Sequence, residues 1–159
     1  GHHNPDVLVI GGAPGKEEDR QGKPFVGEDG LLLDKMLASI NLDPETVLFS
    51  NVIFWRPPGD RNPVQSEVAM CLPFIERLIT LADPKVILLL GEFAARTILG
   101  KSESLSQMRA KWFDHQVTHM SHPIKASVLY HPQYLLNSPA QKRRAWQDLN
   151  KIADKLKKL

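Results

Sequence analysis

The stretch KVILLLGEFAARTILG, residues 85–100, decides the fold class of this chain. Lys85–Leu90 is a continuous apolar run that ends at Gly91, and Phe93–Leu99 follows as a short helical segment. An apolar run without polar alternation is typical of a strand buried on both faces, as in parallel sheets that are covered by helices. The stretch therefore predicts a strand that leads into a helix within an α/β domain.

The same order of strand and helix continues on both sides of this stretch. Further strands are predicted at Val7–Ile10, Val47–Phe54 and Ser127–Tyr130. Further helices are predicted at Leu31–Ile40, from Ser66, whose hydroxyl would cap the helix, to Ala82, and from Ser138-Pro139 towards the C-terminus. These elements predict an α/β fold with a central, mostly parallel, four-stranded sheet flanked by helices.

The length and composition suit one domain. We place this domain at residues 4–159, because Gly1, His2 and His3 resemble the remnant of a purification tag. No apolar stretch reaches the ~18 residues of a membrane span, so we expect a cytoplasmic monomer without a membrane partner. The single cysteine, Cys71, excludes an internal disulfide and any metal site built from cysteines of this chain alone.

Three predicted strand ends should meet at one edge of the sheet. They are the glycine-rich loop after Ile10, the end of the second strand at Asn51, and the turn His131-Pro132 after the last strand. In open parallel sheets, ligands bind beyond the carboxyl ends of the strands. We therefore expect the functional site at this edge.

The glycine-rich loop, Gly11–Gly15, allows more than one interpretation. Such loops bind nucleotide phosphates in some proteins, but Pro14 removes a backbone donor and the acidic run Glu17–Asp19 would repel a polyphosphate. A long, well-packed structural loop is the second interpretation. A loop of this length in a small domain is usually functional, however, and it delivers an apolar ring, Phe25.

Four blocks of the sequence resemble, in order and spacing, the signature blocks of the family-four uracil-DNA glycosylases. The blocks are GGAPGKEEDRQGKPFVG (11–27), NVIFWRPPGDRNP (51–63), MCLPFIERLITLADPKVILLLGEFAARTILG (70–100) and YHPQYLLNSP (130–139). The likeness covers nearly the whole chain from about Asp6. It implies the α/β fold of the uracil-DNA glycosylase superfamily. It also implies a DNA repair enzyme that hydrolyses the N-glycosidic bond of uracil, or of other deaminated bases, in DNA.

The resemblance implies roles for three side chains. Asn51 matches the asparagine that reads uracil, since one amide can pair with both the N3–H donor and the O4 acceptor. Phe25 matches the aromatic residue on which the base stacks, and His131 matches the histidine that stabilises negative charge on uracil O2. Gly11 and Ala13 are expected to line the same uracil pocket. The structural alternatives are core packing for Phe25 and Asn51 and a simple turn for His131.

The DNA backbone is expected to contact basic residues. Arg56 and Arg61 follow the second strand and should meet phosphates of single- or double-stranded DNA. The basic run Lys142, Arg143 and Arg144 should lie nearby, although such a run forms a solvated helix face more often than a nucleic-acid contact.

The chain departs from the family at the iron–sulfur site. The family holds a four-iron, four-sulfur cluster on four cysteines, of which Cys71 matches the fourth while Trp55 stands at the third position. The first two have no counterpart in this sequence. One thiolate cannot hold such a cluster, so we expect neither a cofactor nor a metal site, with Trp55 filling the space.

A second departure concerns catalysis. Gly12 stands where the family has a glutamate that orients or deprotonates water and stabilises the sugar cation. Glu18 is the candidate substitute, unless its side chain is exposed or bound to Arg20, and Asp60 replaces an asparagine of the family. Gly12 leaves an alternative function open, namely a weak or inactive module that binds uracil or another altered base in DNA.

Overall fold

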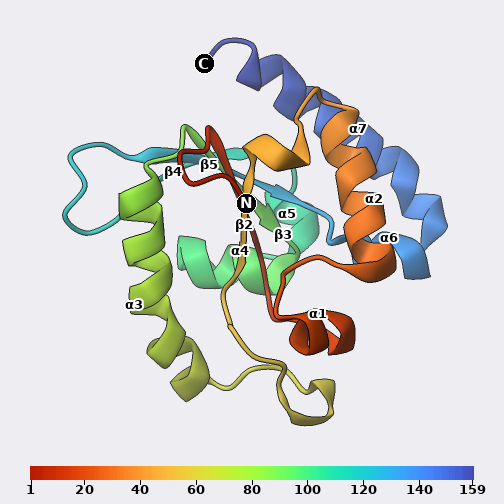
Figure 1. Cartoon of the computed structure of the whole chain (residues 1–159). Helices are drawn as coiled ribbons and strands as arrows, with labels where there is room; N and C mark the ends of the chain where they lie inside the picture. The colour runs from red at the N-terminus through yellow and green to blue at the C-terminus, as the bar shows by residue number, and fades with distance from the viewer.

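A five-stranded β-sheet forms the centre of the computed structural model, which describes residues 1–159 (Figure 1). The strand order is β2-β1-β3-β5-β4. The strands are β1 (Val7–Gly11), β2 (Leu48–Asn51), β3 (Val86–Leu90), β4 (Trp112–His115) and β5 (Ile124–Leu129). All neighbouring pairs are parallel except β4 and β5, which are antiparallel. The predicted fold class, a mostly parallel sheet flanked by helices, is confirmed.

The predicted number of strands is wrong, because the sheet has a fifth strand, β4, at its edge. β4 spans only Trp112–His115, and none of its residues is fully buried. Its residues form neither a continuous apolar run nor a stretch dominated by β-branched side chains, which are the patterns that predicted the other strands. Its antiparallel pairing with β5 lengthens the sheet on the side away from β2.

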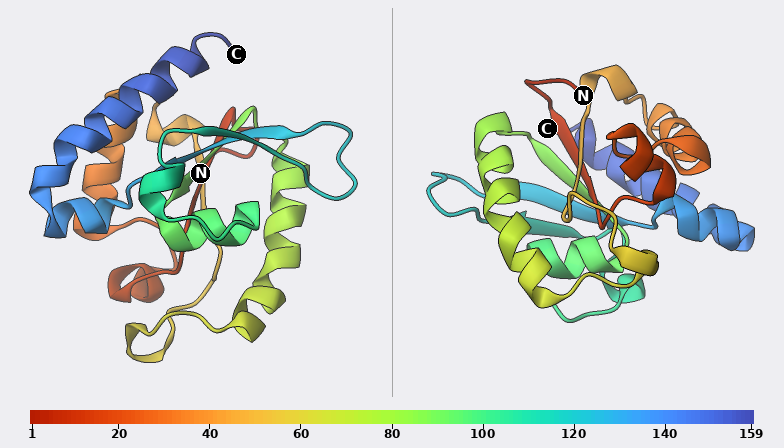
Figure 2. Two further views of the ribbon diagram at one scale, coloured as in Figure 1. Left: turned by 180° about the vertical axis from the view of Figure 1, so that it is seen from behind. Right: turned by 60° about the horizontal axis from the view of Figure 1, so that its bottom comes forward.

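Helices cover both faces of the sheet (Figures 1 and 2). The α-helices are α1 (Lys16–Gln21), α2 (Gly27–Ala38), α3 (Gln65–Ala82), α4 (Glu92–Leu99), α5 (Leu105–Met108), α6 (Pro132–Asn137) and α7 (Lys142–Leu156). Short 3-10 turns lie at Pro44–Thr46, Pro58–Asp60 and Pro139–Gln141. No helix has the length and apolar character needed to cross a membrane.

The core consists of two apolar clusters, one on each face of the sheet. Alternate residues of a strand point to opposite faces, so Leu8 and Ile10 of β1 join one cluster and Val7 and Val9 join the other. The first cluster packs against α3, α4 and α5, and the second packs against α2, α6 and α7. This burial on both faces is the reason that β1 and β3 are apolar throughout.

Some local predictions are corrected by the structure. Ser66 does not cap α3; the helix begins at Gln65, and Glu67 accepts a hydrogen bond from the backbone N–H of Val64 at 2.9 Å. The last helix begins at Lys142, after a 3-10 turn that follows Ser138. At the N-terminus, the backbone N–H of His2 donates to the carbonyl of Val47 at 3.1 Å, so the first residues lie against the start of β2.

Candidate active site

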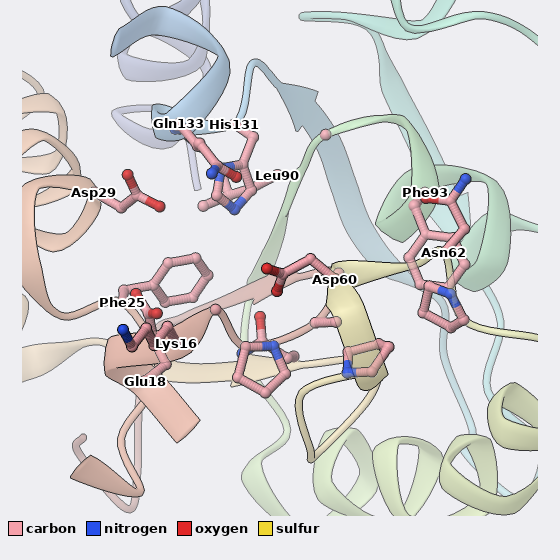
Figure 3. Close-up of a pocket in the computed structure, with 18 of the residues that line it drawn as sticks. Lys16, Glu18, Phe25, Asp29, Asp60, Asn62, Leu90, Phe93, His131 and Gln133 are labelled. Atoms are coloured by element: carbon pink, nitrogen blue, oxygen red, sulfur yellow. Dashed lines mark hydrogen bonds between the residues drawn. The ribbon is translucent and has the colours of Figure 1, made fainter. Parts of the chain in front are cut away.

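A pocket of about 560 Å³ lies at the carboxyl edge of the sheet, where the strand ends were predicted to meet. Gly12 follows β1, Asn51 ends β2, Gly91 follows β3, and His131 lies just after β5. Figure 3 shows side chains from these segments and from α1 and α2 around one space. The structure thus brings Gly12, Ala13, Glu18, Phe25, Asn51 and His131 together, as the sequence predicted.

Phe25 is held in the pocket by an unusual backbone conformation. Its φ is 54°, in the left-handed region of backbone conformation that residues other than glycine rarely adopt. A Cβ atom at Gly30 would lie 2.1 Å from the carbonyl oxygen of Phe25, so only glycine permits this close approach. The ring lies 6.0 Å from those of Phe49 and His131, measured between centroids. Strained residues that are fixed in this way cluster at functional sites.

Asn51 presents its side chain beside Phe25. It is 8% exposed, and it pairs in register with Gly11 of β1. A Cβ atom at Gly11 would lie 2.7 Å from both Asn51 Oδ1 and Phe25 Cζ. Gly11 therefore lies directly behind the amide and the ring, although it does not line the pocket itself.

His131 is positioned by the start of α6. It caps this helix, and its Nδ1 accepts a hydrogen bond from the backbone N–H of Gln133 at 3.1 Å. Burial lowers the pKa of His131 from 6.5 to about 4, so the ring is neutral at neutral pH. Because Nδ1 is an acceptor here, the proton of the neutral ring resides on Nε2. The site therefore offers one uncharged N–H donor.

Gly12 lies against an aromatic ring that the sequence did not single out. Its backbone is not in the left-handed region, so other residues are compatible with its conformation. A Cβ atom there would lie 3.1 Å from Cδ1 of Phe93, which comes from α4 and also lines the pocket. Phe93 thus stands next to position 12, where the resemblance described above implies a carboxylate in the family.

Glu18 does not bind Arg20, which instead pairs with Glu17. Its carboxylate accepts a hydrogen bond from the backbone N–H of Val26 at 3.2 Å. This bond ties α1 to the residue that follows Phe25, so Glu18 lines the pocket and also fixes the loop that holds the ring.

The predicted DNA-contacting residues occupy different surroundings. Arg56 makes two hydrogen bonds to Asp60, at 2.7 and 2.6 Å, and Arg61 binds Glu67 at 2.6 Å. Of this predicted group only Arg61 lines the pocket. The run 142–144 is exposed at the first turn of α7 and lies outside the pocket.

Cys71 and Trp55, which the resemblance places at the family's cluster positions, do not fit an iron–sulfur cluster. Cys71 is 1% exposed within the apolar core, and the Trp55 side chain packs against the same cluster of residues. The indole N–H of Trp55 donates to Glu67 at 3.2 Å, and Glu67 also binds Arg61 and the N–H of Val64. The hydrogen bonds from these groups, that from Arg61 foremost, lower the pKa of Glu67 to about 2. No group of three or more His, Cys, Asp or Glu residues is arranged to hold a metal ion.

Several pocket residues were missed from the sequence, and two of them, Phe93 and Asp29, lie next to the predicted catalytic positions. Phe93 was assigned only to a helix, and nothing in its local pattern indicates that it faces Gly12. Asp29 lies in the first turn of α2, where acidic residues are common because they suit the helix dipole. Neither residue carries a local signal that distinguishes a pocket position from an ordinary one.

Comparison with known proteins gives consistent matches. The family model described as the uracil DNA glycosylase superfamily matches residues 1–150. The Type-4 uracil-DNA glycosylase of Archaeoglobus fulgidus is 36% identical over 156 residues, which cover 97% of this chain and 78% of the relative. The proteins of the same name from Thermotoga maritima and Sulfurisphaera tokodaii are 32% and 31% identical, over 96% and 97% of this chain and 78% and 71% of theirs.

Proposed function

Because the chain belongs to the uracil-DNA glycosylase superfamily, we propose that it hydrolyses the N-glycosidic bond of uracil in DNA, as a step of base excision repair. The observation that carries the proposal is the convergence of Phe25, Asn51 and His131 on one preformed pocket. The substrate is uracil-containing DNA, single- or double-stranded, and the protein acts as a monomer. Other deaminated bases that present the same edge are further candidate substrates.

Recognition begins when the uridine nucleotide leaves the base stack and enters the pocket. Uracil stacks on the ring of Phe25, a contact typically worth ~1–3 kcal/mol. The amide of Asn51 accepts from N3–H and donates to O4, whereas cytosine presents the reverse pattern to it. Asn51 is free for this role, because the hydrogen bond from the Ser50 hydroxyl goes to its backbone carbonyl and not to its amide.

Bond cleavage leaves positive charge on the sugar and negative charge on the base. The Nε2–H of neutral His131 donates to uracil O2 as that charge develops, and a preorganised donor of this kind is typically worth ~10²–10³ in rate. A neutral donor suits this task because it carries no charge that would stabilise the uncharged base in the ground state. Burial of His131 and the N–H of Gln133 together support this protonation state.

The phosphates of DNA are proposed to contact Arg56, Arg61, Lys142, Arg143 and Arg144. Arg56 and Arg61 each hold a carboxylate in the absence of DNA. A guanidinium has five donors, so it is able to bind a phosphate while one side of it remains paired. The fit of Trp55 and Cys71 to the core supports a reaction without an iron–sulfur cluster.

The test is a cleavage assay on labelled oligonucleotides that contain one uracil, with thymine and cytosine oligonucleotides as controls. Alkali converts any abasic site into a strand break, and a gel-shift lane measures binding in parallel. We expect cleavage at uracil only, and we expect Phe25→Ala and Asn51→Ala to weaken recognition while the melting temperature stays close to that of the wild type. Binding of uracil-DNA without cleavage would instead identify a binding module.

A further inference from the structure

Four carboxylates line the pocket, and three of them are already engaged by other groups. Glu18 binds the N–H of Val26, Asp60 binds Arg56 twice, and Glu92 binds both Arg96 at 2.7 Å and the N–H of Leu105 at 3.2 Å. Asp29 is the fourth, and neither a hydrogen bond nor an ion pair contributes to its ionisation. It is therefore the pocket carboxylate with free oxygen atoms.

Asp29 is placed by the same turn that fixes Phe25. The turn runs from Phe25 through Gly27, with φ of 69°, into the first turn of α2, and Gly30 lies against the carbonyl of Phe25. Figure 3 shows the carboxyl group of Asp29 directed from α2 towards the side of the pocket that carries His131 and Gln133. Its position is thus set by backbone that the close contact at Gly30 makes rigid.

This side of the pocket is the side of the glycosidic bond. In the proposed complex Asn51 pairs with N3–H and O4, while His131 donates to O2. In the uracil ring, C2 and its oxygen lie between N3 and N1, and N1 carries the sugar. Moving from Asn51 to His131 therefore leads towards C1′, and Asp29 lies on that side.

We propose that Asp29 is the carboxylate that faces the sugar and the attacking water in this protein, in place of the side chain that Gly12 lacks. This inference rests on the proposed function. As the C1′–N1 bond breaks, both of its electrons go to the uracil ring. The oxygen of water forms the new bond to C1′, its proton passes to the Asp29 carboxylate, and Asp29 returns the proton through solvent to the uracil anion. The negative charge of Asp29 also attracts the positive charge that develops on the sugar.

The surroundings of Asp29 make it a better base than an ordinary aspartate. Burial is the main cause that raises its pKa above the usual 3.8, and the negative charges of Glu18 and Glu28 add to the effect. His131, at the start of α6, is a neutral group on the same side of the pocket. Lys16 and Arg61 are the cations that line the pocket, and Arg61 is paired with Glu67. A carboxylate with a raised pKa accepts a proton from water more readily.

The experiment compares Asp29→Asn with the matched control Glu28→Gln. Both changes remove one negative charge from the first turn of α2, but Glu28 is exposed and does not line the pocket. The single-turnover rate is measured with saturating enzyme on a uracil oligonucleotide. The dissociation constant is measured with an oligonucleotide whose 2′-fluoro uridine resists hydrolysis. Asp29→Ala provides a second variant that suits a helix in case Asn lowers the melting temperature.

We expect Asp29→Asn to reduce the single-turnover rate by ~10²-fold or more, in line with the usual contribution of a general base, while its dissociation constant stays within about threefold. Glu28→Gln should keep the wild-type dissociation constant and lose far less rate than Asp29→Asn, because it removes only the smallest of the contributions that raise the pKa of Asp29. If the wild type cleaves uracil-DNA and the Asp29 variants cleave it equally fast, this inference is overturned and the proposed function stands. Equal losses of binding and rate would overturn it too, since they indicate a structural role. A folded wild type that does not cleave uracil-DNA would overturn the proposed function itself.

Discussion

Gly12 is the residue at which a single added side chain should change the chemistry most directly. Its backbone is compatible with glutamate, and the new Cβ would lie 3.1 Å from Cδ1 of Phe93, so that ring must move by a few tenths of an ångström. We expect Gly12→Glu to raise the single-turnover rate, and to raise it by a larger factor in the Asp29→Asn background. A carboxylate near the developing sugar cation acts on the transition state more than on the ground state.

The control for this prediction is Gly12→Gln, which crowds Phe93 equally but adds no charge. Both variants should lose a similar amount of thermal stability, and only the glutamate should gain rate. If the two variants cleave uracil-DNA equally, position 12 does not face the reacting atoms.

His131 gives a prediction about pH. Its pKa in the folded protein is about 4, against 6.5 for an ordinary histidine, so it remains a neutral donor throughout the range from pH 6 to 8. We expect the single-turnover rate to show no midpoint near pH 6.5 and to fall only at clearly lower pH, measured at constant ionic strength. An acid limb centred near pH 6.5 would contradict the neutral-donor role.

The lowered pKa of His131 also makes the stability of the protein depend on pH. Between about pH 6.5 and pH 4 the unfolded chain binds a proton at His131 that the folded chain does not bind. The contribution of this residue to the free energy of unfolding therefore decreases as the pH is lowered through that window. Melting temperatures measured across this pH window test the effect. Variants of exposed histidines such as His119 show how much of the pH dependence comes from residues other than His131.

At the scale of elements, the loop after β2 is joined to α3 through a single carboxylate. Glu67 accepts from Trp55, from Arg61 and from the N–H of Val64, and these groups hold the segment that follows Asn51. We expect Glu67→Gln to lower the melting temperature more than Glu103→Gln, a change at an exposed position.

We also expect the purified protein to be colourless, and iron and sulfide analysis to find far less than four of each per chain. Stoichiometric iron and sulfide would contradict the packing role of Trp55.

The helices and strands differ in whether the sequence alone predicted them. The buried strands β1 and β3 were identified because burial on both faces demands an unbroken apolar run. The edge strand β4 and the short helices α1 and α6 were not, since they depend on tertiary contacts more than on their own residues. Four blocks in register identified Phe25, Asn51 and His131, but Asp29 and Phe93 became visible only when α2 and α4 were placed around the pocket.

For the whole molecule, the distribution of charge predicts how DNA binding depends on salt. The net charge is only +2, but the exposed run 142–144 begins α7 shortly after α6, whose first turn contains the pocket residue Gln133 (Figure 1). We expect DNA affinity to fall steeply with ionic strength, on the order of one unit of log–log slope for each phosphate contact. Arg143→Gln should reduce that slope by about one unit.

Lys85→Gln is the control for the salt experiment. Lys85 precedes β3 at the amino edge of the sheet, opposite the pocket, and it pairs with Asp6 at 3.2 Å. It should leave the slope unchanged. A slope that is the same in Arg143→Gln and in the wild type would exclude the start of α7 from the DNA interface.

The left-handed backbone at Phe25 has a consequence for how the molecule searches DNA. The loop is locked by the missing Cβ of Gly30 and by the carboxylate of Glu18, so the stacking platform exists before any nucleic acid arrives. The loop is already ordered in the free protein, so DNA binding requires little further loss of conformational entropy and little rearrangement of the protein. We therefore expect free uracil, the product of the proposed reaction, to bind this preformed pocket and to inhibit the enzyme.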